Sequence, residues 1–370
     1  MKVVVLGGTG NFGARICRAL AREPGIALVV AARDLSRAQS LASELGASAV
    51  RLDTQAPGFG ERLQALAPQL LIHTAGPFQG QDPTVARCAA AAQCHYIDLA
   101  DGRRFVCDFA AALNEPFRAV GRTAVTGAST VPALSSAVVD HLRQRFERLE
   151  EIEFCIAPAQ RAPRGPATIA GVLSYCGRPV RVWEKGRWCE RTGWADPQVV
   201  RFARLRPRHG ALCDIPDLEL FPARYAGVST VVFRAALEVV PTQYAFAGLA
   251  RLGRLGLPVQ SPAIAFALHH AGRLLDPLGT SDGGMVVRLR GTAREGTPLQ
   301  LAWNILAPNH RGPEIPCMAA ILLARRLARG EELPIGAMPC MGLLRLQEFE
   351  PEFRRWDMQV DLLEEDVRGA

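Results

Sequence analysis

Lysine is almost absent from this chain. Of its 43 basic residues only Lys2 and Lys185 are lysines, and all the others are arginines. An enzyme that forms a Schiff base with its substrate or with pyridoxal phosphate needs a lysine amine, and only Lys185 is a candidate for that role. P-loop nucleotide hydrolases also need a lysine, and the sequence has no Gly-x-x-x-x-Gly-Lys-Ser/Thr motif. The shortage of lysine therefore argues against both groups of enzymes.

Paired cysteines and long apolar runs are missing as well. The ten cysteines contain no Cys-x-x-Cys pair, and Cys94-His95 has no second pair that completes a tetrahedral metal site. We therefore expect no metal, and we interpret the irregular spacing as reduced thiols of a cytoplasmic protein. No run of about 18 apolar residues is present, so no membrane span is expected. The start of the chain predicts a strand and not a signal peptide.

The surplus of positive charge lacks the clusters that polyanion-binding proteins use. The formal net charge is +7 over 370 residues, and no run of basic residues is longer than two. Nucleic-acid-binding proteins usually gather their basic residues in runs or on one face. The scattered arginines therefore predict no nucleic-acid partner. The length and the 49% hydrophobic content predict a folded chain of two domains.

The N-terminal residues follow the pattern of a dinucleotide-binding loop. Residues 3–6 predict a buried parallel strand, and a helical pattern follows residue 13. The intervening glycines permit a tight turn, let backbone amides approach a pyrophosphate and let the helix lie close to the strand. A second predicted strand at 27–32 completes a Rossmann unit. The predicted nucleotide-binding residues are Gly7, Gly8, Thr9, Gly10, Asn11, Phe12 and Gly13.

The end of the second strand bears on which dinucleotide binds. An acidic residue here binds the ribose 2′-hydroxyl of NAD, whereas an arginine suits the 2′-phosphate of NADP. Arg33 occupies the position, and Ser36 and Arg37 follow it. We predict an NADP site at these three residues because a guanidinium binds phosphate with two hydrogen bonds. Two alternatives stay open: a shift by one residue gives Asp34 the NAD role, or Arg33 is an ordinary solvated strand end.

Strand and helix patterns alternate up to residue 126. Regular alternation predicts an α/β domain with a doubly wound parallel sheet. Ligands bind at the carboxyl edge of such a sheet, where the loops after the strands lie. The further residues that this topology places near the cofactor are Asp53, Gly76, Pro77, Phe78, Asp98 and Ser129. Ala75, which precedes Gly76 in the same loop, is also a predicted cofactor-binding residue.

The second half of the chain has a different pattern. Beyond residue 130 the regular alternation stops, and β-rich segments separated by helices follow. They predict an α+β domain with a mostly antiparallel sheet. We therefore expect a dinucleotide-binding domain at 1–130, a substrate and dimerisation domain at 131–340, and a C-terminal segment at 341–370.

A hydride transfer needs a proton donor or acceptor for the substrate, and the lysines are too few to supply it. Asp98 ends a predicted strand at the ligand edge, where it is a candidate for acid–base chemistry or for contact with the ribose, or a cap for the following loop. His310 and Glu314 lie in a loop with glycine and proline, where functional residues often occur. His73 lies within a predicted strand, and we interpret it as a hydrogen-bonded core residue.

Two further segments are candidates for contact with a substrate or partner. Arg161 and Arg164 precede a Gly-Pro step and suit a substrate carboxylate, or they are ordinary surface arginines. Residues 244–275 are apolar with arginines at intervals, and they predict two amphipathic helices broken at 256–258. This segment packs against another domain or a second subunit of a homodimer, or it contacts lipid or an acyl substrate.

Several of these motifs together resemble the saccharopine dehydrogenase NADP-binding family. They are Gly7–Gly13 with Arg33, Ala75–Phe78 and His95–Leu99, and 312–316, 336–339 and 346–349 are similar to uncharacterised bacterial members. The resemblance implies an NADP-dependent oxidoreductase that transfers a hydride to a C=N, C=O or activated C=C bond of a small-molecule or acyl substrate. It also implies that 341–370 can pack back on the first domain. The alternatives are a lipid-directed trans-acting enoyl reductase and a catalytically silent NADP-binding sensor or assembly protein.

Overall fold

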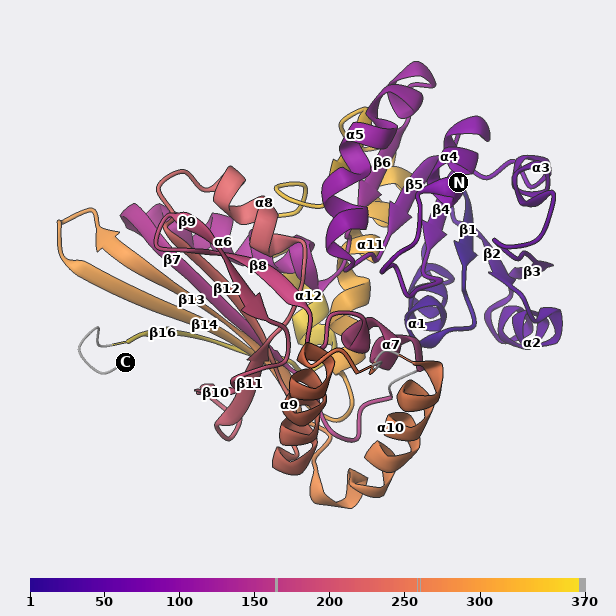
Figure 1. The fold of residues 1–370 in the computed structure, drawn as a ribbon. Helices are drawn as coiled ribbons and strands as arrows, with labels where there is room; N and C mark the ends of the chain where they lie inside the picture. The colour runs from indigo at the N-terminus through magenta and orange to yellow at the C-terminus, as the bar shows by residue number, and fades with distance from the viewer. Residues whose placement is uncertain (164–165, 258, 260, 366–370) are drawn as a thin grey trace. The chain divides into compact units, whose positions relative to one another are not determined.

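The computed structural model describes residues 1–163, 166–257, 259 and 261–365 and divides the chain into two units (Figure 1). Unit 1 comprises Met1–Leu134 and Glu314–Leu344. Unit 2 comprises Ser135–Pro313 and Arg345–Ala370. Each unit is therefore built from two separate stretches of the chain.

The sheet of unit 1 has seven parallel strands in the order β15-β6-β5-β4-β1-β2-β3. Its strands are β1 (Lys2–Leu6), β2 (Ala27–Ala32), β3 (Ser48–Arg51), β4 (Leu70–His73), β5 (His95–Asp98), β6 (Thr123–Thr126) and β15 (Gly336–Pro339). Val3, Val4 and Val5 of β1 are completely buried, as expected of a central parallel strand. Strand order 3-2-1-4-5-6 is that of a Rossmann sheet, so the predicted α/β fold class is confirmed.

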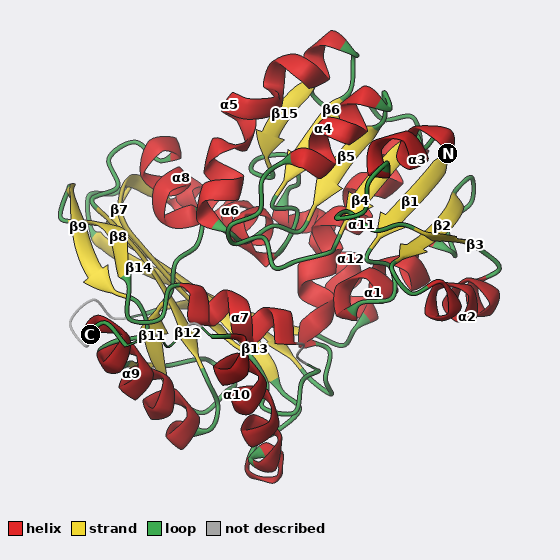
Figure 2. Ribbon diagram, turned by 45° about the vertical axis from the view of Figure 1, so that its right-hand side comes forward, coloured by secondary structure: helices red, strands yellow, loops and turns green. Residues whose placement is uncertain are grey.

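Helices connect the strands of unit 1 and pack on the sheet (Figure 2). They are α1 (Asn11–Leu20), α2 (Leu35–Leu45), α3 (Phe59–Ala65), α4 (Thr84–Ala91), α5 (Arg103–Ala119) and α11 (Ile315–Ala328), with a π-helical turn at Thr130–Leu134. Helix α11 packs against α1, and α5 packs against β15. The late segment 314–344 thus covers the helix that follows the glycine loop.

The C-terminal part of the chain is divided between the two units at a different place from the one expected. The stretch that returns to unit 1 is 314–344, because β15 pairs in parallel with β6 and satisfies the backbone groups at that edge of the sheet. Residues from 345 onward belong to unit 2, where β16 (Gln359–Glu364) pairs antiparallel with β14 (Pro298–Ala307). The expected segment 341–370 therefore does not pack back on the first unit as a whole.

The sheet of unit 2 has the order β10-β11-β12-β7-β13-β14-β16, with a β8–β9 hairpin attached to β12. The remaining strands are β7 (Phe146–Ala157), β8 (Pro179–Glu184), β9 (Arg187–Thr192), β10 (Gln198–Val200), β11 (Arg208–Leu212), β12 (Thr230–Ala236) and β13 (Gly283–Ala293). Within this second sheet, β7–β12 is the only parallel pair among the described residues. The predicted second domain with a mostly antiparallel sheet is confirmed.

Six helices of unit 2 accompany this sheet in the described part of the chain. They are α6 (Ser135–Leu142), α7 (Pro166–Ser174), α8 (Asp217–Arg224), α9 (Val240–Arg254), α10 (Pro262–Leu274) and α12 (Leu346–Arg355), with 3-10 turns at Arg143–Arg145, Asp276–Leu278 and Gly312–Glu314. The apolar segment 244–275 forms α9 and α10, and Pro258 in the expected break lies outside the described residues. No helix among the described residues has the length and apolar character needed to cross a bilayer.

A carboxyl group is buried between α6 and α8 of unit 2. Asp217 has no solvent exposure, and its Oδ1 accepts a hydrogen bond from the Ser135 hydroxyl. Its Oδ2 has no hydrogen-bond partner within the described residues. Burial raises the pKa of Asp217 from 3.8 to about 7, although the Ser135 hydroxyl and a backbone amide lower it. The folded protein therefore binds a proton at Asp217 more tightly than the unfolded chain does.

We expect this carboxyl group to make the protein less stable as the pH rises. The folded state holds the extra proton between about pH 4 and about pH 7, so the free energy of unfolding falls across that range by on the order of 4 kcal/mol. The substitution Asp217→Asn keeps an oxygen that accepts from Ser135 but cannot ionise. Urea denaturation measures the free energy of unfolding of both proteins between about pH 5 and pH 8. The value for the variant should increase relative to that of the natural protein as the pH rises. Parallel pH profiles would show that Asp217 does not titrate in this range.

Candidate functional site

The glycine loop turns tightly between β1 and α1. Gly7 has a φ of +79°, which favours glycine, and the N–H groups of Gly7 and Gly8 donate to the carbonyl oxygen of Ala31 over 2.9 and 3.0 Å. The N–H of Gly10 donates to the carbonyl oxygen of Gly7 over 2.9 Å. These bonds hold the loop against the end of β2, so its conformation is set by the backbone.

The start of α1 lies very close to the loop. A Cβ atom on Gly13 would stand 2.2 Å from the carbonyl oxygen of Gly7 and 2.7 Å from Oγ1 of Thr74. Gly10 is the N-cap residue and provides no side-chain hydrogen bond to the first turn. The first turn of a helix has backbone N–H groups without intrahelical partners, and they attract anions. Only glycine fits this cradle, and its chemistry suits a pyrophosphate.

Thr9, Asn11 and Phe12 complete the loop and are each half-buried. Oδ1 of Asn11 accepts a hydrogen bond from Nη1 of Arg15 over 2.6 Å. The seven residues predicted from the glycine motif therefore lie together between β1 and the first turn of α1.

Arg33 lies at the end of β2 with its side chain exposed. Ser36 and Arg37 lie in the first turn of α2 and are exposed as well. Neither arginine side chain has a hydrogen-bond or ion-pair partner within the described residues. Asp34 is the N-cap of α2, and its Oδ1 accepts a hydrogen bond from the backbone N–H of Arg37 over 3.1 Å. The carboxylate is thus used by the helix, whereas two cations are available for an anionic ligand.

The loop after β4 forms another part of the carboxyl edge of the parallel sheet. Gly76 and Pro77 are exposed, and the carbonyl oxygen of Ala75 accepts from Nε2 of Gln81 over 3.2 Å. Phe78 is buried, and its ring centroid lies 5.0 Å from that of His73. Phe78 therefore anchors this loop and leaves the two residues before it on the surface.

Asp53 follows β3 and is half-buried. Its Oδ1 accepts a hydrogen bond from the backbone N–H of Gln55 over 3.1 Å. The carboxylate therefore stabilises the turn after β3, and its side chain stays partly accessible.

Polar side chains of β4 and β5 form a buried cluster at the carboxyl ends of these strands. Nδ1 of His73 lies 3.0 Å from the hydroxyl oxygen of Tyr96. Burial lowers the pKa of His73 to about 4, so the imidazole is neutral at physiological pH. Burial also raises the pKa of Tyr96 well above its usual value. Both residues behave as hydrogen-bonded members of the core.

Asp98 at the end of β5 ties two loops together. Its Oδ1 accepts hydrogen bonds from the N–H groups of Ala100 and Gly127 over 2.9 and 2.8 Å and from Oγ1 of Thr126 over 2.9 Å. The side chain has no solvent exposure, and burial raises its pKa to about 6 although these bonds lower it. The geometry favours the loop-capping role over acid–base chemistry.

His310 and Glu314 belong to different units although they are close in sequence. His310 is exposed with a φ of +63°, and its N–H donates to the carbonyl oxygen of Ser281 in unit 2 over 2.9 Å. Glu314 begins the second stretch of unit 1, where its Oε1 lies 3.0 Å from Nε of Arg15. The protein therefore uses Glu314 to link the returning segment to α1.

Of the two loop arginines proposed for a substrate carboxylate, only Arg161 lies within the described residues. Nε of Arg161 donates to the carbonyl oxygen of Asp276 over 3.0 Å, and Nη2 donates to that of Pro277 over 3.4 Å. Arg164 lies outside the described residues. The hydrogen bonds of Arg161 thus support a local structural role.

Sequence reasoning missed two residues at the nucleotide loop. Thr74 follows β4, and its Oγ1 donates to the carbonyl oxygen of Leu6 over 2.9 Å beside Gly13. A lone hydroxyl residue directly after a buried strand was the available signal. Arg15 bonds Asn11 and pairs with Glu314. The spacing of four residues between Asn11 and Arg15 indicated their contact, but no local pattern indicated the ion pair of Arg15 with Glu314.

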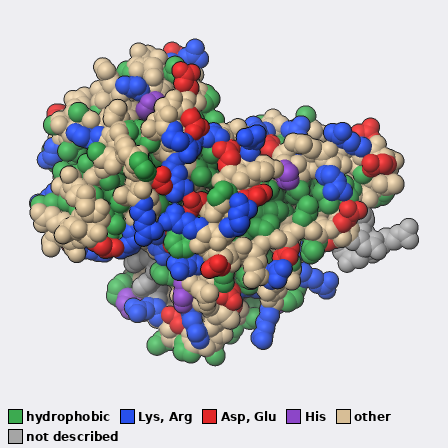
Figure 3. All heavy atoms as spheres, turned by 180° about the vertical axis from the view of Figure 1, so that it is seen from behind, with side chains coloured by type: hydrophobic (Ala, Val, Ile, Leu, Met, Phe, Trp, Pro, Cys, Tyr) green, Lys and Arg blue, Asp and Glu red, His purple; other side chains and the backbone are tan. Residues whose placement is uncertain are grey.

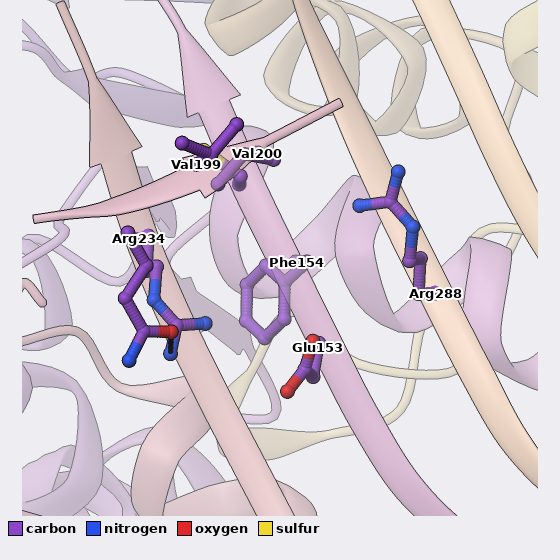
Figure 4. Close-up of a pocket in the computed structure, with 8 residues that line it drawn as sticks. Glu153, Phe154, Val199, Val200, Arg234 and Arg288 are labelled. Carbon is purple, nitrogen blue, oxygen red and sulfur yellow. Dashed lines mark hydrogen bonds between the residues drawn. The ribbon is translucent and has the colours of Figure 1, made fainter. Parts of the chain in front are cut away.

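A pocket of about 80 Å³ lies on the sheet of unit 2. Figure 4 shows Glu153 of β7 with Arg234 of β12 and Arg288 of β13 on the strands to either side. Nη2 of Arg234 donates to Oε1 of Gln198 over 2.7 Å, and Nε of Arg288 lies 3.1 Å from Oε2 of Glu365. Ligand pockets usually exceed about 300 Å³, so this one is too small for an organic substrate.

The fold and the glycine loop define unit 1 as a dinucleotide-binding Rossmann domain. Residues 3–131 match the family model described as saccharopine dehydrogenase NADP binding domain. This match confirms the resemblance inferred from the motifs over that part of the chain. No group of three or more His, Cys, Asp or Glu side chains with metal-binding geometry is present among the described residues.

Solved structures share the fold along the whole chain at low identity. The apo saccharopine dehydrogenase (L-Glu forming) from Saccharomyces cerevisiae is 12% identical, with a TM-score of 0.71 over 99% of this chain and 100% of the other. The homospermidine synthase from Legionella pneumophila, solved with NAD, is also 12% identical, with a TM-score of 0.64 over 100% of this chain and 93% of the other. No curated protein sequence matches the chain. At these identities the likeness establishes the fold alone.

Proposed function

We propose that the protein is an NADP-dependent oxidoreductase that transfers a hydride to a C=N, C=O or activated C=C bond of a small-molecule or acyl substrate. The observation that carries the proposal is the exposed Arg33, which has no partner within the described residues and lies beside Ser36 and Arg37. Asp34 caps α2 and is thereby engaged. The description of the matching family supports the same assignment. The fold of the two similar structures supports an oxidoreductase, and one of the two was solved with NAD.

The residues of unit 1 divide the binding of NADP among them. The backbone of Gly7–Gly13 and the first turn of α1 bind the pyrophosphate, and Arg33 with Ser36 and Arg37 binds the 2′-phosphate. The bound cofactor supplies the hydride. Asp98 and Glu314 hold loops and helices in place, so among the three acid–base candidates of the sequence only His310 of unit 2 has an exposed side chain.

Titration of the purified protein with NADPH and NADH, followed by nucleotide fluorescence, tests the cofactor assignment. We expect NADPH to bind more tightly. A screen for NADPH oxidation with α-keto acids plus amines, and separately with enoyl and keto thioesters, then identifies the substrate class. Binding of neither nucleotide contradicts the proposal. NADPH binding without oxidation in any arm favours a nucleotide sensor, the second candidate, because His73, Asp98 and Glu314 are buried or paired.

A further inference from the structure

Helices α9 and α10 of unit 2 present large apolar side chains to solvent. Leu255 after α9 is 79% exposed, and Phe266 and Leu274 of α10 are 63% and 81% exposed. Leu252, Leu257 and Leu278 are exposed as well. We name the hairpin surface as these six residues together with Arg251, Arg254 and Arg273. Apolar patches of this kind usually mark an interaction site.

Each helix uses its other side to pack on unit 2. The buried residues of α9 are Gln243, Phe246, Ala247 and Ala250, which recur at helical spacing, and α9 packs against β11. Helix α10 packs against α7. The exposed leucines and Phe266 thus lie on faces that the protein's own core does not need.

The charge around these apolar residues is mostly positive, and the acidic residue of the segment from Val239 to Leu278 is Asp276. No Asp or Glu occurs from Val239 to Leu275. Arg251, Arg254 and Arg273 are exposed and have no hydrogen-bond or ion-pair partner within the described residues. Figure 3 shows green apolar atoms at the bottom of the view, where α9 and α10 lie in Figure 1, with blue basic atoms and some red acidic atoms among them. The hairpin surface is therefore both apolar and cationic.

We propose that the hairpin surface binds the surface of an anionic lipid bilayer. Leucine and phenylalanine side chains insert among the acyl chains near the headgroups, and arginines rest their aliphatic stems on the apolar layer while their guanidinium groups reach lipid phosphates. Helices α9 and α10 have 15 and 13 residues, which is shorter than the roughly 20 that span a bilayer. The helices therefore lie along the membrane surface.

A second copy of this chain fits the hairpin surface less well. A two-fold interface brings the same patch of both subunits together, so arginine would meet arginine. The segment from Val239 to Leu278 has three exposed arginines and one carboxylate, that of Asp276, so most of that charge would not be neutralised. An anionic bilayer supplies both the apolar layer and the negative charge.

Flotation of the full-length protein with lipid vesicles tests the proposal. The probes are vesicles of phosphatidylcholine alone and vesicles of equal parts phosphatidylcholine and phosphatidylglycerol. We expect binding to the anionic vesicles that weakens at high salt, because salt screens the attraction of exposed charges. The triple variant Arg251→Gln, Arg254→Gln, Arg273→Gln should bind on the order of 100-fold more weakly, since each arginine near the surface contributes about a factor of five. The triple variant Leu255→Ser, Phe266→Ser, Leu274→Ser should also lose binding.

A matched triple variant controls for the net charge. Arg22, Arg187 and Arg294 are exposed arginines outside the hairpin surface, and replacing all three by Gln removes the same charge. This control should bind anionic vesicles as the natural protein does, and circular dichroism should show that all variants fold. The proposal is overturned if the natural protein ignores anionic vesicles or if the control loses binding equally. It is also overturned if the serine variant changes only the oligomeric state in sedimentation, which would make the surface a subunit interface.

Discussion

The substitution Gly13→Ala should abolish NADPH binding and lower the free energy of unfolding by about 3 kcal/mol or more. The added Cβ would stand 2.2 Å from the carbonyl oxygen of Gly7 and 2.7 Å from Oγ1 of Thr74. Backbone and a short side chain oppose it, and neither has a flexible end that can move aside. Thr74 is further held by its hydrogen bond to the carbonyl oxygen of Leu6. Relief of the clash must move α1 away from the loop, which separates the two parts of the pyrophosphate cradle.

Urea denaturation and NADPH titration measure the two effects, and Gly248→Ala is the matched control. Gly248 is also a helical glycine, in α9, but no heavy atom lies within 4 Å of the position a Cβ would take. Alanine there should be neutral or stabilise the protein by about 0.5 to 1 kcal/mol, because it lowers the entropy of the unfolded chain and favours helix. Normal stability and NADPH affinity of the Gly13→Ala protein would contradict the tight approach of α1 to the loop.

The dinucleotide-binding part of the fold was predictable because its determinants are local. The apolar run 3–6, the glycine spacing and the helical pattern after Gly13 lie within one unit of strand, turn and helix, and each has a direct conformational consequence. The role of Asp34 as the N-cap of α2 could also have been predicted from the sequence, since an Asp directly before a helix is a common N-cap. The N–H of Arg37 does donate to its carboxylate.

The contributions of the late segments were not predictable for the opposite reason. Strand β15 is four residues long, has no clear periodicity and pairs with β6 from a distant part of the sequence. The boundary between the two units, which falls between His310 and Glu314, likewise depends on tertiary contacts, because Glu314 forms an ion pair with Arg15 of unit 1. A local sequence pattern does not predict contacts between residues that are far apart in the sequence.

The burial of Asp98 shows a further limit. Strands β4 and β5 of the parallel sheet are buried on both faces at their carboxyl ends, so the strand pattern cannot separate a ligand-facing side chain from a core one. Asp98 has the sequence position of a catalytic group, whereas its hydrogen-bond donors are Ala100 and Gly127 of the two loops and Thr126 at the end of β6. The sequence left both roles open, and the contacts favour the structural one.

The substitution Arg33→Ala should weaken NADPH binding by roughly 10- to 100-fold and leave NADH binding within a factor of about three. A charge-assisted hydrogen bond contributes about 1.5 to 3 kcal/mol, and only NADPH carries the 2′-phosphate that accepts it. Because Arg33 has no protein partner within the described residues, its removal leaves no buried group unsatisfied and should not change stability. Fluorescence titration with both nucleotides gives the two affinities, and urea denaturation checks the fold.

The substitution Asp34→Ala complements this experiment, since it distinguishes an NADP site at Arg33 from an NAD site at Asp34. If Asp34 only caps α2, its removal should lower the free energy of unfolding by about 1 kcal/mol and leave the ratio of NADPH to NADH affinity unchanged. If Asp34 instead binds the ribose 2′-hydroxyl, its removal should weaken NADH binding specifically, and Arg33→Ala should affect both nucleotides alike. That second pattern would refute the phosphate-binding role of Arg33. The adjacent arginine and aspartate thus let one pair of variants decide between an NADP site and an NAD site without any knowledge of the substrate.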